Sequence, residues 1–557
     1  MIPRRIAASL AALIAIAGMW SLSACSTNDS AEVSAETRTL TYLEPQAFAT
    51  LYPPAAGFYP NGGVVNNITD RLLYQDPDTL ELHPWIAVEL PEINSDATEY
   101  TFRIRTDVTY SDGTAVSAEN VVANLDLYGL GNQDRRLTAS EQINNYEYGE
   151  VLSPDTVRFH FSAPSPGFAQ AVSTLNAGLL ADSSLAQSIE GFGPGKATGV
   201  IGSGPFVITE EALGSGLTLS AREDYDWAPE SLETQGRPWL DQIHFVLAGE
   251  DSVRTGALVA GQAQIARQIE APVERHLENS GITILSAGTN GVNNGLSLRF
   301  RHPLLEDIRV RQAIIAGVDR EEIIRTLFSD SYPLATSSLA STALGYTDTS
   351  AAYIYDPQRA TELLDAAGWT PGDDGIRVKD GHRLSLNVNH SLPQPRSQDV
   401  ITKIQENLKR IGIEVTLQPG DQAAQNAAVL SQDTIQVMHT MVGRADYDVI
   451  KSQYYSTNRN SLLNFHRDDG SIGDPELERL LEAVSSSARE EDRAAASAEV
   501  QRYLADNAYV LPLFEEPQVF GIQPYVHGFT TEAVGRPSFY GVRIHPDNSD
   551  ANAKEKP

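Results

Sequence analysis

The chain has 557 residues, more than a single hydrophobic core usually contains, so two or three lobes are expected. Hydrophobic residues make up 41% and charged residues 20%, which is the composition of a soluble globular protein. The formal net charge of −32 argues against nucleic acid as a partner and against a polybasic membrane patch, because an acidic surface repels phosphate groups. The one cysteine, Cys25, excludes an internal disulfide and a thiolate metal cluster.

Residues 1–24 have the features of a signal peptide. Arg4 and Arg5 precede an apolar run that is short for a membrane span, and small residues follow it. The run ends in Leu-Ser-Ala directly before Cys25, which resembles the lipobox of bacterial lipoproteins. That resemblance implies lipidation of the Cys25 thiol and cleavage before it; the alternative is an ordinary secretory leader with an incidental cysteine. Residues 25–37 are then a lipidated cysteine and a polar, acidic tether.

The clearest local pattern in the folded part spans residues 99–128. Apolar side chains at Tyr100 and Phe102 alternate with polar ones, which predicts a strand with one buried face. An Asp-Gly-Thr turn follows, in which Gly113 can adopt a positive φ. Ser117 suits the N-cap of a helix whose apolar residues recur at helical spacing. The local pattern predicts a strand, a turn and a helix packed on a sheet.

The first part of this stretch, EYTFRIRTDVTYSDGTAVSAENV, resembles a run in the extracellular solute-binding proteins of family 5, the oligopeptide, dipeptide and nickel binders of ABC importers. Other blocks continue the resemblance in the same order, and together they cover roughly residues 38–545. These blocks are GSGPF at 202–206, DYDW at 224–227, ALVAGQAQI at 257–265, LLEDIRVRQAIIAGVDR at 304–320 and VLPL at 510–513.

The second half of the chain has several helix starts with capping sequences. Asp319 precedes Glu322 by three residues, and Asp356 and Asp474 each stand directly before a proline that suits the first helical position. A helix that Gly412 ends is followed by an apolar strand over 413–417. Alternating helices and strands of this kind predict an α/β fold.

The resemblance implies two α/β lobes of the periplasmic-binding-protein type, class II, joined by a hinge of two crossover segments, with a small extra domain inserted in the first lobe. The boundaries that it implies are 38–65, 200–291 and 508–546 for lobe I, 66–199 for the inserted small domain, 292–507 for lobe II and 547–557 for a disordered tail.

The sequence HTMVGRADYDVIKSQYY resembles a family segment in which an aspartate on the cleft wall binds the α-ammonium of peptide ligands. Asp446 occupies the matching position. A buried carboxylate needs a cation or strong donors, so this role would select a positively charged ligand group. The alternative is that Asp446 caps a turn or pairs with Arg444. The set of expected ligand-binding residues is Asp446, Tyr447, Arg444, His439, Tyr59 and Asn66.

Three places in the sequence depart from the family pattern. Gly443 stands where peptide binders often have tryptophan, and Arg299 stands where the family often has an Asn-Thr pair. Asp448 and Val449 stand where an Asp-Pro pair is common. The departures at Gly443 and at residues 448–449 weaken the inference that the ligand is a standard peptide. A binder of a metal chelate, siderophore or other non-peptide solute therefore stays open as an alternative.

Motifs for catalysis or cofactor binding are missing from the sequence. There is no H-E-x-x-H, C-x-x-C or G-x-S-x-G, and the glycine-rich run before Ala197 lacks the Ser or Thr of a P-loop. We therefore expect no enzymatic activity, no cofactor and no metal site. The expected protein is a monomeric lipoprotein anchored outside the cytoplasm, which captures peptides or similar solutes and passes them to permease subunits with their own ATPases. A tethered hydrolase and a sensory or adhesive lipoprotein are the alternatives from other classes.

Overall fold

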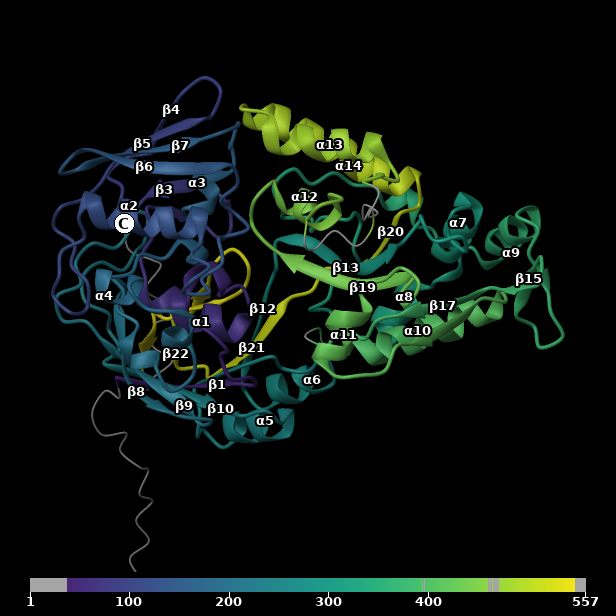
Figure 1. Cartoon of the computed structure of the whole chain (residues 1–557). Helices are drawn as coiled ribbons and strands as arrows, with labels where there is room; N and C mark the ends of the chain where they lie inside the picture. The colour runs from purple at the N-terminus through teal and green to yellow at the C-terminus, as the bar shows by residue number, and fades with distance from the viewer. Residues whose placement is uncertain (1–37, 393, 395, 459–462, 464–469, 546–557) are drawn as a thin grey trace, which may run out of the picture. The chain divides into compact units, whose positions relative to one another are not determined.

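The computed structural model describes residues 38–392, 394, 396–458, 463 and 470–545. The predicted signal peptide, Cys25, the tether and the tail lie outside these residues. Two large sheets and one smaller sheet organise the described chain (Figure 1).

The first large sheet has seven strands and forms the centre of lobe I. Its order is β12-β21-β11-β1-β10-β9-β8, with β1 parallel to both β10 and β11. The strands are β1 (Thr39–Glu44), β8 (Phe206–Ala212), β9 (Gly216–Ala221), β10 (Gln242–Leu247), β11 (Ile265–Arg267), β12 (Thr283–Ala287) and β21 (Gln518–Ile522). The remaining lobe I elements are α1 (Tyr59–Ile68), α5 (Asp251–Val259), α6 (Ala271–Asn279), β22 (Val526–His527), β23 (Thr530–Thr531), β24 (Pro537–Ser538) and β25 (Arg543–Ile544).

The inserted small domain is built on a four-stranded antiparallel sheet of order β4-β5-β7-β6. The predicted strand, turn and helix are confirmed as β5, a turn with Gly113 at φ 85° and α2, whose N-cap Ser117 Oγ accepts from Asn120 N at 3.2 Å. The elements are β2 (Leu73–Gln75), β3 (Leu82–Pro84), β4 (Glu92–Ile93), β5 (Glu99–Arg103), α2 (Ala118–Leu130), β6 (Tyr146–Ser153), β7 (Thr156–Phe161), α3 (Phe168–Ala171) and α4 (Asp182–Leu185).

The second large sheet has five strands, of order β18-β17-β19-β13-β20, and forms the centre of lobe II. Its strands are β13 (Gly291–Leu298), β17 (Ser385–Val388), β18 (Glu414–Leu417), β19 (Val437–Gly443) and β20 (Val510–Phe514). Helices cover both faces, so all eight residues of β13 are buried (Figure 1). The helices are α7 (Ile308–Gly317), α8 (Arg320–Leu327), α9 (Pro357–Ala366), α10 (Ser397–Arg410), α11 (Gln422–Ala428), α12 (Val449–Tyr454), α13 (Pro475–Ser486) and α14 (Glu490–Asp506). A small sheet of β14 (Thr370–Pro371), β15 (Arg377–Lys379) and β16 (His382–Arg383) extends this lobe.

The predicted helix caps in lobe II are confirmed. Asp319, Asp356 and Asp474 each accept a hydrogen bond from the backbone N–H three residues on, at 2.8, 2.8 and 3.1 Å. Gly412 has φ 85°, a left-handed conformation that ends α10 without the steric cost that a side chain would add. These caps satisfy backbone donors at the helix starts that would otherwise lack partners.

Two short crossovers join the large sheets. Residues 288–290 lead from β12 to β13, and residues 515–517 lead from β20 to β21. Because β20 pairs with β13 in the five-stranded sheet, the return to lobe I falls at 515–517, later than the boundary at residue 508 that the sequence suggested.

Arg299, one of the departures from the family pattern, has a structural role. Its side chain is 1% exposed and donates to the carbonyl oxygens of Ser431 and Ile435 at 2.9 and 2.8 Å. Burial lowers the pKa of the guanidinium to about 10. Arg299 thus anchors the loop that connects α11 to β19, and both of these elements contribute residues to the cleft described next.

Candidate functional site

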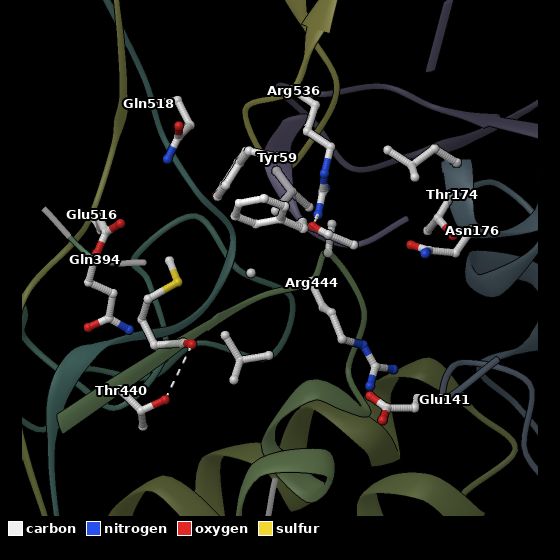
Figure 2. A pocket seen from close by; sticks show the side chains of 18 of the residues that line it. Tyr59, Glu141, Thr174, Asn176, Gln394, Thr440, Arg444, Glu516, Gln518 and Arg536 are labelled. Carbon is white, nitrogen blue, oxygen red and sulfur yellow. Dashed lines mark hydrogen bonds between the residues drawn. The ribbon is translucent and has the colours of Figure 1, made fainter. Parts of the chain in front are cut away.

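A cleft of about 860 Å³ lies between the lobes, and its size is within the range typical of small-molecule sites (Figure 2). Lobe I, the small domain, lobe II and the second crossover all contribute to its wall. Side chains that represent these four parts are Tyr59 and Arg536, Glu141 and Asn176, Gln394 and Arg444, and Glu516. A second pocket of about 330 Å³ shares Glu141, Gln142 and Arg444 with the cleft.

Tyr59 lies between two arginines on the lobe I wall. The guanidinium carbons of Arg267 and Arg536 are 5.4 and 5.1 Å from its ring centroid, which is cation–π distance. Each arginine also has an acidic partner: Glu44 Oε2 is 3.0 Å from Arg267 Nε, and Glu532 Oε1 is 3.2 Å from Arg536 Nη1. Burial raises the pKa of Tyr59 to about 12. This wall therefore presents an aromatic ring with two charges that are already balanced.

Arg444 and Asp446 form a two-pronged ion pair. Arg444 Nε and Nη2 donate to the two carboxylate oxygens of Asp446, both at 2.9 Å, and both side chains are buried. Arg444 lines the cleft, whereas Asp446 is not among its lining residues. In Figure 2 the carboxylate of Glu141 points toward the same guanidinium. The structure thus contains the Arg444–Asp446 pair, which the sequence analysis gave as the alternative to ligand binding by Asp446.

Of the other predicted ligand-binding residues, some line the cleft and some do not. Tyr59 and His439 line the cleft, while Tyr447 and Asn66 do not. The Tyr447 ring packs in the lobe II core, and its hydroxyl donates to Glu490 at 3.2 Å. Asn66 Oδ1 accepts from Arg71 Nη2 at 2.8 Å, and Arg71 lines the cleft. Asn66 therefore orients a cleft residue without lining the cleft itself.

His439 is the centre of a buried hydrogen-bond chain. Its Nε2 lies 2.8 Å from Asn294 Oδ1 and its Nδ1 lies 2.9 Å from Ser397 Oγ. Burial, with a smaller contribution from His390, lowers the pKa of His439 to about 3, so the ring is neutral. Because the amide oxygen of Asn294 can only accept, Nε2 carries the proton and Nδ1 accepts from Ser397.

Glu516 stands in the second crossover and was not predicted from the sequence. Its side chain is 5% exposed, and Oε2 accepts from Asn294 Nδ2 at 2.9 Å. Burial raises its pKa from 4.5 to about 7, although the bond from Asn294 acts in the opposite direction. The signal in the sequence is a pair of glutamates, Glu515 and Glu516, directly after the apolar strand at 510–513.

Gly443 permits a close approach between the lobes. A Cβ atom there would lie 2.6 Å from Val534 Cγ1 and 2.8 Å from Thr289 Cγ2, closer than carbon atoms pack. Thr289 belongs to the first crossover, and its hydroxyl lies 3.2 Å from the Tyr59 hydroxyl. A tryptophan at position 443 would displace these neighbours, so the departure from the family pattern has a steric consequence at the cleft.

Within the described residues, no group of three or more His, Cys, Asp or Glu side chains is arranged to hold a metal ion. The same part of the chain has no helix that is both long and apolar enough to cross a membrane.

Residues 81–461 match the family model "Bacterial extracellular solute-binding proteins, family 5 Middle". The match spans more than half of the chain, and the chain therefore belongs to the bacterial extracellular solute-binding proteins of family 5. These proteins are the solute-binding components of ABC importers.

The chain is similar to several named bacterial proteins. Protein XP55 of Streptomyces lividans is 24% identical over 500 residues, which are 87% of this chain and 84% of that protein. The glutathione-binding protein GsiB of Salmonella choleraesuis (strain SC-B67) is 24% identical over 381 residues, 68% of this chain and 69% of GsiB. The structure of NikA from Brucella suis, in complex with Fe(III)-EDTA, has a TM-score of 0.76 at 23% identity and covers 91% of this chain and 100% of NikA. This structural likeness confirms the predicted two-lobed α/β fold.

The pKa of Glu516 predicts how stability depends on pH. Between pH 4.5 and pH 7 the folded protein keeps a proton on Glu516 that the unfolded chain releases, so the free energy of unfolding falls as pH rises through this window. Glu516→Gln removes this pH-dependent fall in the free energy of unfolding, because an amide stays neutral at every pH in the window. We expect Glu516→Gln to exceed the wild type in stability by up to ~3 kcal/mol at pH 8 and by far less at pH 5, in urea denaturation followed by fluorescence.

Glu515→Gln is the matched control, because Glu515 bonds to Ser341 and does not line the cleft. The stability difference between Glu515→Gln and the wild type should be the same at both pH values. A Glu516→Gln protein whose advantage is equal at pH 5 and pH 8 would show that Glu516 is ionised at neutral pH.

Proposed function

We propose that this protein captures peptides or peptide-like solutes in the cleft and delivers them to the permease of an ABC importer. The observation that carries the proposal is a cleft of about 860 Å³ whose wall is shared by both lobes, the small domain and a crossover. A bound solute in such a place contacts both lobes, so it favours the closed arrangement over an open one. The family relationship and the glutathione-binding relative support the same class of ligand.

In our proposal, hydrogen bonds from the small domain to lobe II and from the first crossover to lobe I stabilise the closed form. Gln75 Nε2 of the small domain donates to the carbonyl oxygen of Ala445 in lobe II at 3.0 Å, and Asn290 Nδ2 in the first crossover donates to the carbonyl oxygen of Ala533 at 2.6 Å. In our proposal the crossovers are the hinge, capture involves no catalysis, and ATP is hydrolysed on partner chains. The protein acts as a monomer that docks on the permease in its closed form.

A metal chelate or other polycarboxylate solute is the second candidate. Arg536 Nε is buried and has no hydrogen-bond partner among the described residues, although the rest of the side chain is paired. A carboxylate of such a ligand would satisfy this donor. The ring nitrogens of His439 are both engaged, so His439 is not available to coordinate the metal itself.

Native mass spectrometry of residues 26–557 as purified tests the ligand class. Peptides or small peptide-like molecules released from the protein and sequenced by tandem fragmentation are the expected result. A single non-peptide mass with a metal isotope pattern would contradict the proposal and favour the chelate. If the protein is empty, a thermal-shift screen with defined di- to pentapeptides decides, and the absence of any stabilisation would count against peptides.

Closure of the cleft can be tested at Gly443. Gly443→Leu places a side chain where even a Cβ would be 2.6 Å from Val534, so the closed form becomes strained. We expect binding of the ligands found above to weaken at least ~10-fold in calorimetry, with little change in the stability of the unliganded protein. Gly256→Ala, at an exposed position of α5 where an added Cβ would meet no other part of the fold, is the control. Unchanged affinity in Gly443→Leu would mean that the lobes do not approach at this point when ligand binds.

We also propose that Cys25 anchors the protein to the outer face of the cell membrane through lipid chains. The support is the Leu-Ser-Ala-Cys sequence, with the only cysteine of the chain at the position that a lipobox requires. Stable anchoring needs more than one acyl chain, which bacterial lipidation supplies. Cys25→Ala should abolish labelling with a palmitate analogue and move the protein from the membrane fraction to the soluble fraction. A Cys25→Ala protein that stays processed and membrane-bound would refute the anchor.

A further inference from the structure

Glu516 differs from the other acidic side chains around the cleft. Glu44, Glu532 and Asp446 each pair with an arginine that lines it, and the carboxylate of Glu141 points toward Arg444 in Figure 2. Glu516 forms no ion pair with any described residue, although it is 5% exposed and lines the cleft. A buried carboxylate without a counter-charge is costly, so the carboxyl stays protonated unless a partner from outside the chain supplies the positive charge.

The hydrogen bonds around Glu516 are directed toward it. Ser397 donates to His439, the Nε2 proton of His439 is donated to Asn294 Oδ1, and Asn294 Nδ2 donates to Glu516 Oε2. Asn294 also donates to Gln394 Oε1 at 3.2 Å, which fixes its amide in this orientation. The chain thus positions one oxygen of Glu516 by a neutral donor and supplies no positive charge.

The titratable groups near Glu516 do not balance its charge either. The phenols of Tyr59 on α1 and Tyr332 after α8 lie within its electrostatic reach, and burial keeps both protonated by raising their pKa values. His439 on β19 is neutral. Burial and the bond from Asn294 alone shift the pKa of Glu516, so neither His390, which also lines the cleft, nor Arg267 on β11, which is paired with Glu44, balances its charge.

We propose that Glu516 is the site that binds the cationic amino group of the ligand. The assignment rests on the proposed capture of peptides and locates the terminal ammonium at the crossover, away from Asp446. Asp446 cannot serve in the same way while Arg444 occupies both of its oxygens. At Glu516 the ammonium supplies the missing charge, and the carboxyl releases its proton to solvent as the ion pair forms.

The position of Glu516 in the second crossover also links binding of the ligand's amino group to closure of the lobes. Glu516 belongs to the segment that joins β20 to β21, so it moves with neither lobe alone. When the amino group of a ligand is bound at Glu516, the rest of the ligand can contact residues of both lobes. The class of ligand that fits is a short peptide or similar solute with a free primary amine.

The test uses two peptide libraries of three to five residues made only of Ala, Gly, Leu and Ser, one with free and one with acetylated N-termini. Without Lys, Arg or His, the terminal ammonium is the only cation in the first library and the second has none. Affinities are measured by calorimetry at pH 8 for the full chain and for Glu516→Gln, Glu515→Gln and Asp446→Asn. We expect wild type and Glu515→Gln to prefer the free library by about 10- to 100-fold, and Glu516→Gln to lose the preference.

The pH dependence of the affinity is a second readout, which distinguishes an ion pair at Glu516 from a role of this side chain in packing. For wild type, affinity for the free library should fall about tenfold per pH unit below pH 7, with release of one proton, while Glu516→Gln should show a flat profile. Equal binding of both libraries by wild type, or a preference that survives in Glu516→Gln but disappears in Asp446→Asn, overturns the assignment and leaves peptide capture intact. If neither library binds, peptide capture fails, and the assignment of Glu516 fails with it.

Discussion

The two crossovers run beside each other, and this constraint determines where the cleft lies and what lines it. β12 pairs with β21 in the seven-stranded sheet, with Ala287 opposite Gln518, and β13 pairs with β20 in the five-stranded sheet, with Asn294 opposite Phe514. The segments between these pairs are three residues each, so they are too short to let the lobes separate freely. Side chains of the crossovers therefore lie where the two sheets meet. Thr289 and Asn290 contact lobe I groups there, and Glu516 faces the cleft.

The electrostatics of the cleft follow from burial. Four arginines line it in a protein with a formal net charge of −32, yet three of them, Arg267, Arg444 and Arg536, have a carboxylate partner in the fold. Buried ion pairs cost desolvation energy and contribute little net stability, so their value here is to fix the shape and the hydrogen-bonding directions of the wall. The fourth, Arg71, forms no ion pair with a described residue; its guanidinium donates to Asn66 Oδ1 and to backbone carbonyl oxygens, so it is the cleft arginine whose charge the fold leaves unmatched. The cleft then distinguishes ligands by the group that contacts Glu516 and by the hydrogen-bond donors without a partner in the described residues, such as Arg536 Nε.

The sequence predicted features that depend on neighbours along the chain. The strand at 99–103, the N-caps Ser117, Asp319 and Asp356, and the α/β order of lobe II need only local patterns, and all are present. The candidate site depended on tertiary contacts and was predicted less completely. Tyr59, His439 and Arg444 line the cleft as predicted. Asp446 instead forms an ion pair with Arg444, and Asn66 accepts a hydrogen bond from Arg71. Glu516 could not be distinguished from 72 other acidic residues, because its burial arises only when the second crossover meets β13.

Gly443 and Arg444 show how one short segment can change a binding site without changing the fold. The absence of a side chain at Gly443 lets the end of β19 approach Thr289 and Val534, and the neighbouring Arg444 neutralises the carboxylate at Asp446. The same segment therefore brings the lobes close and removes a negative charge from the lobe II wall. Glu516 lines the same cleft and is 5% exposed, and burial disfavours its ionised form. Closure and the charge of Glu516 are then coupled: an empty closed cleft favours the protonated carboxyl, and a ligand amine favours the carboxylate and the closed lobes together.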